Sequence, residues 1–385
     1  MEYLNLNLYR FSQTIKRVDW LLVFFILPIV IAGLVTMKSF SISENVGNFF
    51  DKQIIWAFLS LIVFFSFSFI DFRFLKKTWV LVGLFLFIST LLILLFVFGS
   101  TVKGAQSWFS FAGFSFQPVD LMKLILILIL AKYFSRRHVE IKSIKHIFIS
   151  GLYAFIPFTL ILLQPDFGSA MVIALIWLGM VLVSGISKTH LLLVFTGGAI
   201  IFFSLWTFVF APYQKARIVS FINPLADMHG SGYNALQSTI AVGSGELTGK
   251  GLGFGTQSRL QFLPEPQTDF IFAAFAEEWG FIGSFLLLIL YGLVIWRILV
   301  SALLGATNFE ILFGIGIAIF LMSHILVNIG MNLGLMPVTG IPLPFMSYGG
   351  SHLLTEFMAL GILMSFRKYS RPAHKDDMKN EFLGI

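Results

Sequence analysis

The chain has 385 residues, of which 57% are hydrophobic and 12% are charged. An ordinary soluble domain is about 25% charged, so this composition excludes one and indicates a membrane protein. The formal net charge of +7 does not predict a nucleic-acid partner, because in a membrane protein the placement of Lys and Arg matters more than their sum. Cysteine is absent and the seven histidines show no ligand spacing, which excludes disulfides, thiolate chemistry and a histidine metal site.

Residues 1–17 alternate polar and apolar side chains and precede a full-length span without a cleavage site. We expect a short cytoplasmic interfacial helix rather than a signal peptide. A membrane-crossing helix needs about 20 mostly apolar residues. The sequence predicts an all-α polytopic membrane protein, a single transmembrane domain over 1–385. Its ten spans fall near Trp20 to Val35, Ile54 to Ile70, Val80 to Phe98, Leu121 to Phe134, Ile147 to Leu163, Ser169 to Val183, Leu191 to Phe210, Phe270 to Trp296, Ile311 to Gly330 and Leu353 to Ser365.

The distribution of basic residues predicts the orientation. Most of the 26 Lys and Arg residues fall on one side if both termini, including the tail 367–385, are cytoplasmic, and cytoplasmic loops collect such residues. The long segment 211–269 is then extracytoplasmic. It contains apolar and aromatic residues and a glycine-rich stretch from Gly243 to Gly253, so we expect an ordered functional loop rather than a disordered one.

Asp269 is the first candidate for catalysis. It follows Pro264 and Pro266, which restrict the backbone as the loop re-enters the membrane. An acid at that place is suited to chemistry on a substrate at the membrane surface. The alternative is an N-cap for the following helix.

Further ionisable residues are predicted to lie near the outer surface. Glu277 and Glu278, about two turns beyond Asp269, are expected in a polar cavity or in a buried ion pair with Lys123 or Arg217. Asp166 is expected either at the substrate or as a helix cap. Candidates for substrate binding are these residues together with Asp120, which lies three residues before Lys123 on the same helix face.

The loop carries Lys215, Arg217, Lys250 and Arg259 on the side where positive charge is least expected. Lys and Arg bind phosphate and pyrophosphate, so lipid head-group binding is one interpretation and solvated charge the other. The glycines around Lys250 lack the GxxxxGK[ST] spacing, which excludes a nucleotide site.

The segment from Met336 to Ser351 contains three prolines and several glycines. It predicts a shaped, non-helical segment at membrane depth, which is tolerated only where it is buried in protein or lines a cavity. Glu356 lies within the last span, where pairing inside the bundle is the simplest expectation.

At this point the sequence resembles the SEDS family (shape, elongation, division and sporulation). The matching motifs are Gly104-Ala105-Gln106 with Trp108; Gln117-Pro118 with Lys123; Gln164-Pro165-Asp166 with Gly168; Gln237-Ser238; Gly243-Ser244-Gly245; Gly249-Lys250-Gly251-Leu252-Gly253; Phe262-Leu263-Pro264-Glu265; Thr268-Asp269-Phe270-Ile271-Phe272-Ala273 with Glu277-Glu278; and Gly340-Ile341-Pro342-Leu343-Pro344-Phe345 with Ser347-Tyr348-Gly349-Gly350-Ser351. The compact length and Gly255 to Ser258 look more like the elongation members, the RodA proteins, than the division members, the FtsW proteins.

The resemblance implies a ten-span glycosyltransferase of the bacterial inner membrane that polymerises lipid II for cell elongation and rod shape. It also implies a class B penicillin-binding protein as transpeptidase partner, besides other elongation-complex proteins and membrane lipids. The family's essential loop aspartate maps onto Asp269. Trp108 and Ser347 lie in family motifs and join the substrate-binding candidates.

Three positions depart from the family: Gln267 replaces a usual His, Ser107 a usual Arg and Asp120 a usual Glu. A divalent cation, Mg²⁺ or Mn²⁺, is the expected substitute where basic charge is missing at a pyrophosphate leaving group. The hypothesis for Asp269 is a general base that deprotonates the acceptor 4-hydroxyl. The alternatives are a lipid II flippase, which needs a polar path across the whole bilayer, and a membrane scaffold for wall enzymes.

Overall fold

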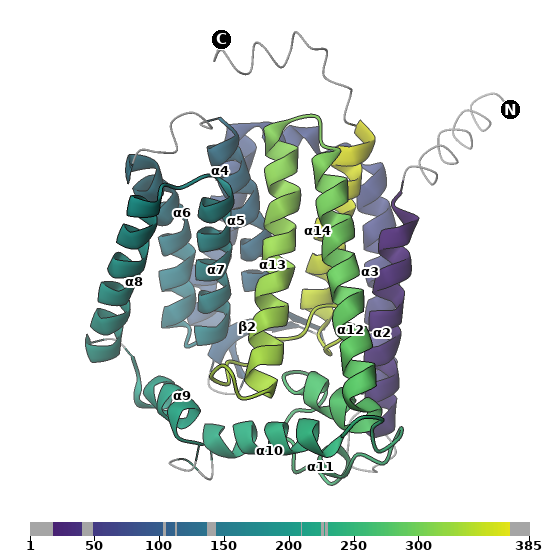
Figure 1. Ribbon diagram of the computed structural model, residues 1–385. Helices are drawn as coiled ribbons and strands as arrows, with labels where there is room; N and C mark the ends of the chain where they lie inside the picture. Colours follow the sequence, from purple (N-terminus) through teal and green to yellow (C-terminus); the bar gives the residue numbers. More distant parts are fainter. Residues whose placement is uncertain are drawn as a thin grey trace, which may run out of the picture.

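The computed structural model describes residues 18–40, 49–102, 105–111, 114–136, 144–208, 210–224, 227 and 230–369. Ten long helices form the bundle (Figure 1). They are α2 (Trp20–Phe40), α3 (Phe49–Phe69), α4 (Thr78–Phe98), α5 (Pro118–Ser135), α6 (Ile144–Leu163), α7 (Phe167–Val183), α8 (Lys188–Phe208), α12 (Ile271–Leu303), α13 (Asn308–Asn332) and α14 (Gly350–Tyr369). Each predicted apolar run corresponds to one of them within a few residues, which confirms the all-α polytopic fold.

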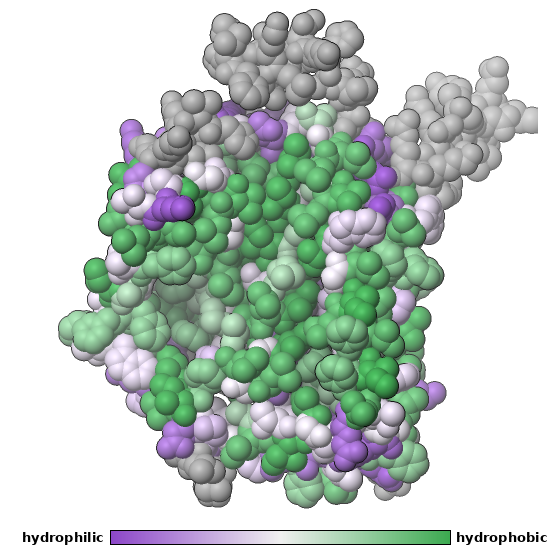
Figure 2. Space-filling model, in the orientation of Figure 1, coloured by the Kyte–Doolittle hydropathy of each residue, from purple (hydrophilic) through white to green (hydrophobic). Residues whose placement is uncertain are grey.

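Within the described residues, seven of these helices are long and apolar enough to cross a membrane. The other three are α7, which has 17 residues, and α5 and α14, which carry charged side chains. Figure 2 shows a broad hydrophobic band on the face that it draws, with hydrophilic residues collected towards its two ends. Because lipid chains offer no hydrogen bonds, such a band is what a membrane-embedded surface requires.

One end of the bundle is joined by a cluster of charged side chains around the buried Asp19 carboxylate. Asp19, directly before α2, contacts Arg297 of α12 at 2.6 Å and Arg367 of α14 at 2.9 Å. The Ser301 hydroxyl donates to the same carboxylate oxygen at 2.9 Å. The start of α2 and the end of α14 therefore lie at the same end of the bundle. The interfacial helix expected over 1–17 and most of the predicted tail lie outside the described residues.

The opposite end carries the long connections (Figure 1). The segment after α8 folds into α9 (Pro212–Ile222), α10 (Ser231–Ser244) and the short α11 (Thr256–Arg259). Between α4 and α5 lies a three-stranded antiparallel sheet of β1 (Ser100–Val102), β2 (Ala105–Phe111) and β3 (Phe114–Phe116), in which Phe109 pairs with Phe116. The sequence analysis did not predict this sheet. A 3-10 helix, η1 (Phe72–Lys76), joins α3 to α4 at the other end.

The segment 337–349 has no regular secondary structure, yet it enters the bundle between α13 and α14. Phe345 and Met346 are almost fully buried. Gly33, in the middle of α2, allows this entry, because a Cβ atom there would lie 2.3 Å from the Met346 carbonyl oxygen. The predicted shaped, buried segment is therefore present, and it brings irregular backbone against the middle of a membrane span.

We predict that Asp19→Ala destabilises the protein strongly. The Asp19 carboxylate is buried, while the Arg297 and Arg367 side chains are 14% and 26% exposed, so we expect its removal to cost about 1 to 3 kcal/mol through the donors left without their acceptor. Burial raises the pKa of Asp19, but the hydrogen bonds from Arg297 and Ser301 and the charge of Arg367 outweigh it and leave the pKa lowered. This stabilisation is therefore present at neutral pH and is lost as the pH falls through the lowered value.

Thermal unfolding in detergent measures the effect. Asp71→Ala is the matched control, since its ion pair with Arg73 is solvent-exposed and is worth less than about 1 kcal/mol. Equal losses of thermal stability in the two variants would contradict the assignment.

Candidate active site

Asp269 lies where the long loop returns to the bundle, two residues before α12 begins. Its backbone carbonyl oxygen accepts hydrogen bonds from Asn328 at 3.0 Å and from Asn332 at 3.1 Å. The Asn332 side-chain oxygen in turn accepts the backbone N–H of Ala273 at 3.1 Å. Two buried amides of α13 therefore fix both the peptide of Asp269 and the first turn of α12.

The side chain of Asp269 is half-buried. Phe270, not Asp269, occupies the N-cap position of α12, so the alternative role as helix cap is wrong. One carboxylate oxygen of Asp269 lies 3.4 Å from the position that a Cβ atom would take on Gly340. Gly340 also has a φ of 76°, a conformation that favours glycine. The acid therefore stands beside backbone that has no side chain to cover it.

The segment 337–349 also holds the residues directly before the acid. Ser347 donates its hydroxyl to the Thr268 carbonyl at 2.7 Å, and the Tyr348 N–H donates to the Gln267 carbonyl at 2.8 Å. Ser347 is 5% exposed, so this predicted binding residue contacts the chain rather than solvent. Its interactions place it in the frame around Asp269.

Glu277 is fully buried and holds the glycine-rich part of the loop. Its carboxylate contacts the Lys250 ammonium at 2.8 Å. It also accepts the backbone N–H groups of Gln257 at 3.0 Å and Ser258 at 3.3 Å, besides the hydroxyl groups of Thr256 and Ser258. The prediction that Glu277 pairs with Lys123 or Arg217 was wrong. The ion-pair partner of Glu277 is Lys250.

Glu278 and the glycines complete the same structure. Gly251 donates its N–H to the Glu278 carbonyl at 3.0 Å, and Gly253 donates to the Glu278 carboxylate at 3.0 Å. Gly249, Gly251 and Gly253 all have positive φ. At Gly249 a Cβ atom would lie 2.1 Å from the Glu278 carbonyl oxygen. The glycine-rich stretch thus wraps closely around the start of α12.

The acids at the neighbouring helices have defined partners. Asp120 and Lys123 form an ion pair at 3.1 Å in which both side chains are 2% exposed. Asp166 is the N-cap of α7, accepting the Ser169 N–H at 3.0 Å, and it also accepts the Gln117 amide at 3.2 Å. The capping alternative for Asp166 is confirmed.

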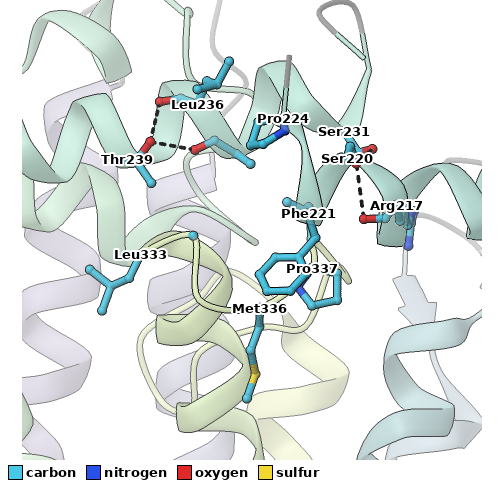
Figure 3. Close-up of a pocket in the computed structure, with 13 residues that line it drawn as sticks. Arg217, Ser220, Phe221, Pro224, Ser231, Leu236, Thr239, Leu333, Met336 and Pro337 are labelled. Carbon is cyan, nitrogen blue, oxygen red and sulfur yellow. Dashed lines mark hydrogen bonds between the residues drawn. The ribbon is translucent and has the colours of Figure 1, made fainter. Parts of the chain in front are cut away.

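A cavity of about 170 Å³ lies beside the loop and includes Arg217 in its lining (Figure 3). Its walls come from α9, α10 and the residues after α13, including Pro337 and Val338. Ser220 and Ser231 contact each other at 2.6 Å on one side of it. The cavity thus abuts the segment that reaches Gly340.

Trp108 lies on β2, is half-buried, and accepts the Ser100 hydroxyl with its carbonyl oxygen at 2.9 Å.

Residues 14–372 match the family model of the FtsW, RodA and SpoVE proteins, described as cell cycle protein. The chain belongs to this family. It is 36% identical over 371 residues to the probable peptidoglycan glycosyltransferase FtsW of Thiomicrospira cyclica, with 91% of this chain and 92% of the relative covered. It is 39% identical over 285 residues to the peptidoglycan glycosyltransferase MrdB of Escherichia coli K12, with 74% of this chain and 77% of the relative covered.

A solved structure described as "Structural coordination of polymerization and crosslinking by a peptidoglycan synthase complex" has the same fold. Its TM-score is 0.77 at 31% identity, with 91% of this chain and 98% of that chain covered. FtsW and MrdB align with similar identity, so overall identity alone does not separate division members of the family from elongation members.

Several residues of this FtsW/RodA/SpoVE-family site were missed by the sequence analysis. Asn328 and Asn332 lie four residues apart in α13 and are fully buried. Gln53 of α3 donates to the Ser347 carbonyl at 3.1 Å, and Tyr291 of α12 donates to the Pro344 carbonyl at 2.6 Å. The available signal was polar residues inside apolar spans, which usually face the bundle interior.

We predict that Glu277→Ala releases the segment 249–259 from α12. The change leaves the Lys250 ammonium and two backbone N–H groups without their acceptor, at about 1 to 3 kcal/mol for each buried group. Hydrogen–deuterium exchange over 249–259 should rise and thermal stability should fall. Lys250→Ala is the control, because Lys250 is 29% exposed and its removal leaves the other donors bonded. If the two variants exchange equally fast, the carboxylate does not organise the loop.

Proposed function

We propose that this chain is a peptidoglycan glycosyltransferase that polymerises lipid II, with Asp269 as the general base. The observation that carries the proposal is the arrangement of Asp269. Its peptide is fixed by Asn328 and Asn332, while its half-buried carboxylate faces Gly340 at the end of the bundle that bears the long loop. A fixed backbone with an accessible acid is the geometry that proton transfer to a positioned base requires.

The proposed reaction is a single displacement at the anomeric carbon of the donor sugar. The Asp269 carboxylate takes the proton of the acceptor 4-hydroxyl as the hydroxyl oxygen bonds to the anomeric carbon of the donor sugar. The bond from that carbon to the lipid pyrophosphate breaks, and the pyrophosphate leaves with the electron pair. One displacement converts the α-linked donor into a β-linked product, so one positioned acid is sufficient.

The leaving pyrophosphate needs positive charge. Lys123 and Lys250 both form ion pairs with carboxylates, so we assign them a structural role. Arg217 lines the cavity beside 337–338, and we assign the pyrophosphate contact to it because guanidinium groups bind such oxygens bidentately. Mg²⁺ or Mn²⁺ carried in with the pyrophosphate would supplement that charge.

The cellular assignment follows the finer sequence resemblance. The motif Gly255 to Ser258, which resembles the elongation members, supports elongation and rod shape rather than division. The fold shared with a peptidoglycan synthase complex supports a class B penicillin-binding protein as partner. When it is expressed in elongation-deficient cells, we expect the protein to restore rod shape. In division-deficient cells we expect it not to restore division. The reverse pattern would make it a division enzyme.

We predict that Asp269→Asn lowers lipid II polymerisation by at least about 100-fold, the usual worth of a general base. The assay combines the purified protein, its transpeptidase partner and labelled lipid II, with penicillin present to suppress cross-linking. Asp71→Asn, at the opposite end of the bundle, should retain parental activity. Polymer from Asp269→Asn at the parental rate would remove the base assignment, and transfer of lipid II between leaflets without polymerisation by the parent would favour a flippase.

We predict that the long loop is extracytoplasmic and the η1 connection cytoplasmic. The chain has no cysteine, so single cysteines give an unambiguous readout. Phe254→Cys, at a side chain that is 68% exposed, should react with a membrane-impermeant maleimide in intact spheroplasts. Arg73→Cys should react only after the membrane is opened. The opposite labelling pattern would invert the topology.

A further inference from the structure

Five ionisable side chains are buried together inside the bundle. They come from α5, α13 and α14, and each is at most 6% exposed: Asp120, Lys123, His324, His352 and Glu356. His352 contacts the Glu356 carboxylate at 2.9 Å and Asp120 at 3.5 Å. Lys123 lies 3.1 Å from Asp120 and 3.4 Å from the His324 Nε2 atom.

Both ends of this network contact the backbone of 337–349. His324 places its Nδ1 atom 3.2 Å from the Pro342 carbonyl oxygen. Glu356 accepts the Phe345 N–H with its Oε2 atom at 3.0 Å. The residue that the sequence left without a role therefore holds a backbone amide within the Pro-rich segment.

Phe345 occupies a backbone conformation that a bulky residue rarely adopts. Its φ is 61°, and such a conformation persists only where the surroundings fix it. A hydrogen bond from a backbone N–H to a buried carboxylate is stronger than one between neutral groups. The bond to Glu356 therefore helps to keep Phe345 in this conformation.

The strained residue is connected to the acid by short steps. Leu343 donates its N–H to the Ser347 hydroxyl at 2.8 Å, across the turn that contains Phe345. Ser347 then donates to the Thr268 carbonyl at 2.7 Å, one residue before Asp269. If Phe345 relaxes, the turn between Leu343 and Ser347 changes and the support for Thr268 changes with it.

We propose that Glu356 is a positioning residue for Asp269, acting through the Phe345 N–H and the turn 343–347. This inference rests on the proposed role of Asp269. His352 lies beside the Glu356 carboxylate and also contacts Asp120. Stability alone does not account for the network, since buried ion pairs are often replaceable by apolar residues without loss. Glu356 is 1% exposed, which favours a role through the protein rather than in contact with substrate.

The test compares Glu356→Ala with Glu356→Gln. The amide oxygen of Gln still accepts the Phe345 N–H, whereas Ala removes the acceptor. For Glu356→Ala we expect kcat to fall by about 100-fold, the typical consequence of a misplacement of about 1 Å, with KM for lipid II nearly unchanged. Glu356→Gln should stay within about threefold of the parent, since the hydrogen bond survives.

The matched control is Glu310→Ala. Glu310 is also buried, pairs with Lys76 at 2.8 Å and accepts the Ala306 N–H at 2.6 Å, but it lies at the other end of α13. Its loss should lower stability and leave the kcat of the folded fraction near the parental value. If Glu356→Gln is as slow as Glu356→Ala, or if Glu310→Ala is equally slow, the positioning role is overturned.

Hydrogen–deuterium exchange provides a readout independent of activity. Glu356→Ala should raise exchange over 341–348 and over 265–270, while Glu310→Ala leaves both segments protected. Unchanged exchange in Glu356→Ala would overturn the inference. An active Asp269→Asn variant would instead remove the proposed role of Asp269, and the exchange data would still decide whether Glu356 holds the turn.

Discussion

The structure depends on one constraint: irregular backbone inside a membrane bundle must find every hydrogen bond within the protein. The segment 337–349 meets this constraint with side chains from several helices. Three side chains donate hydrogen bonds to its carbonyl groups: Tyr291 to Pro344, Asn328 to Ile341 and Gln53 to Ser347. An unpaired polar group in such surroundings costs several kcal/mol. The segment is consequently fixed in place, and the backbone around Asp269 is fixed against it.

Buried ionisable side chains help to meet this constraint. Glu277 binds the glycine-rich loop, and Glu356 binds the turn at Phe345. At Asp269, Asn328 and Asn332 hold the peptide carbonyl. The half-buried Asp269 side chain thus lies at the end of the bundle where a lipid-linked substrate would lie.

The sequence predicted the spans because apolar runs of sufficient length have few alternatives to membrane helices. It also marked Asp269, since two nearby prolines and a following apolar run locate the return of the loop. The partner of Glu277 was not predictable, because Lys250 is far away in sequence and only the folded glycine turns bring it close. The small sheet at β2 was missed since its short strands follow directly after a span. Side chains that bond distant backbone, such as Gln53, leave no periodic signal.

Hydrogen–deuterium exchange of the parental protein in lipid nanodiscs tests most directly whether 337–349 is held rigidly although it lacks regular structure. The backbone N–H groups of Phe345, Ser347 and Tyr348 all donate hydrogen bonds within the protein. They should therefore exchange as slowly as amides in the middle of α13. Exchange as fast as that of the exposed residues near Phe254 would show that the segment is not fixed, and the account of how Asp269 is positioned would be wrong.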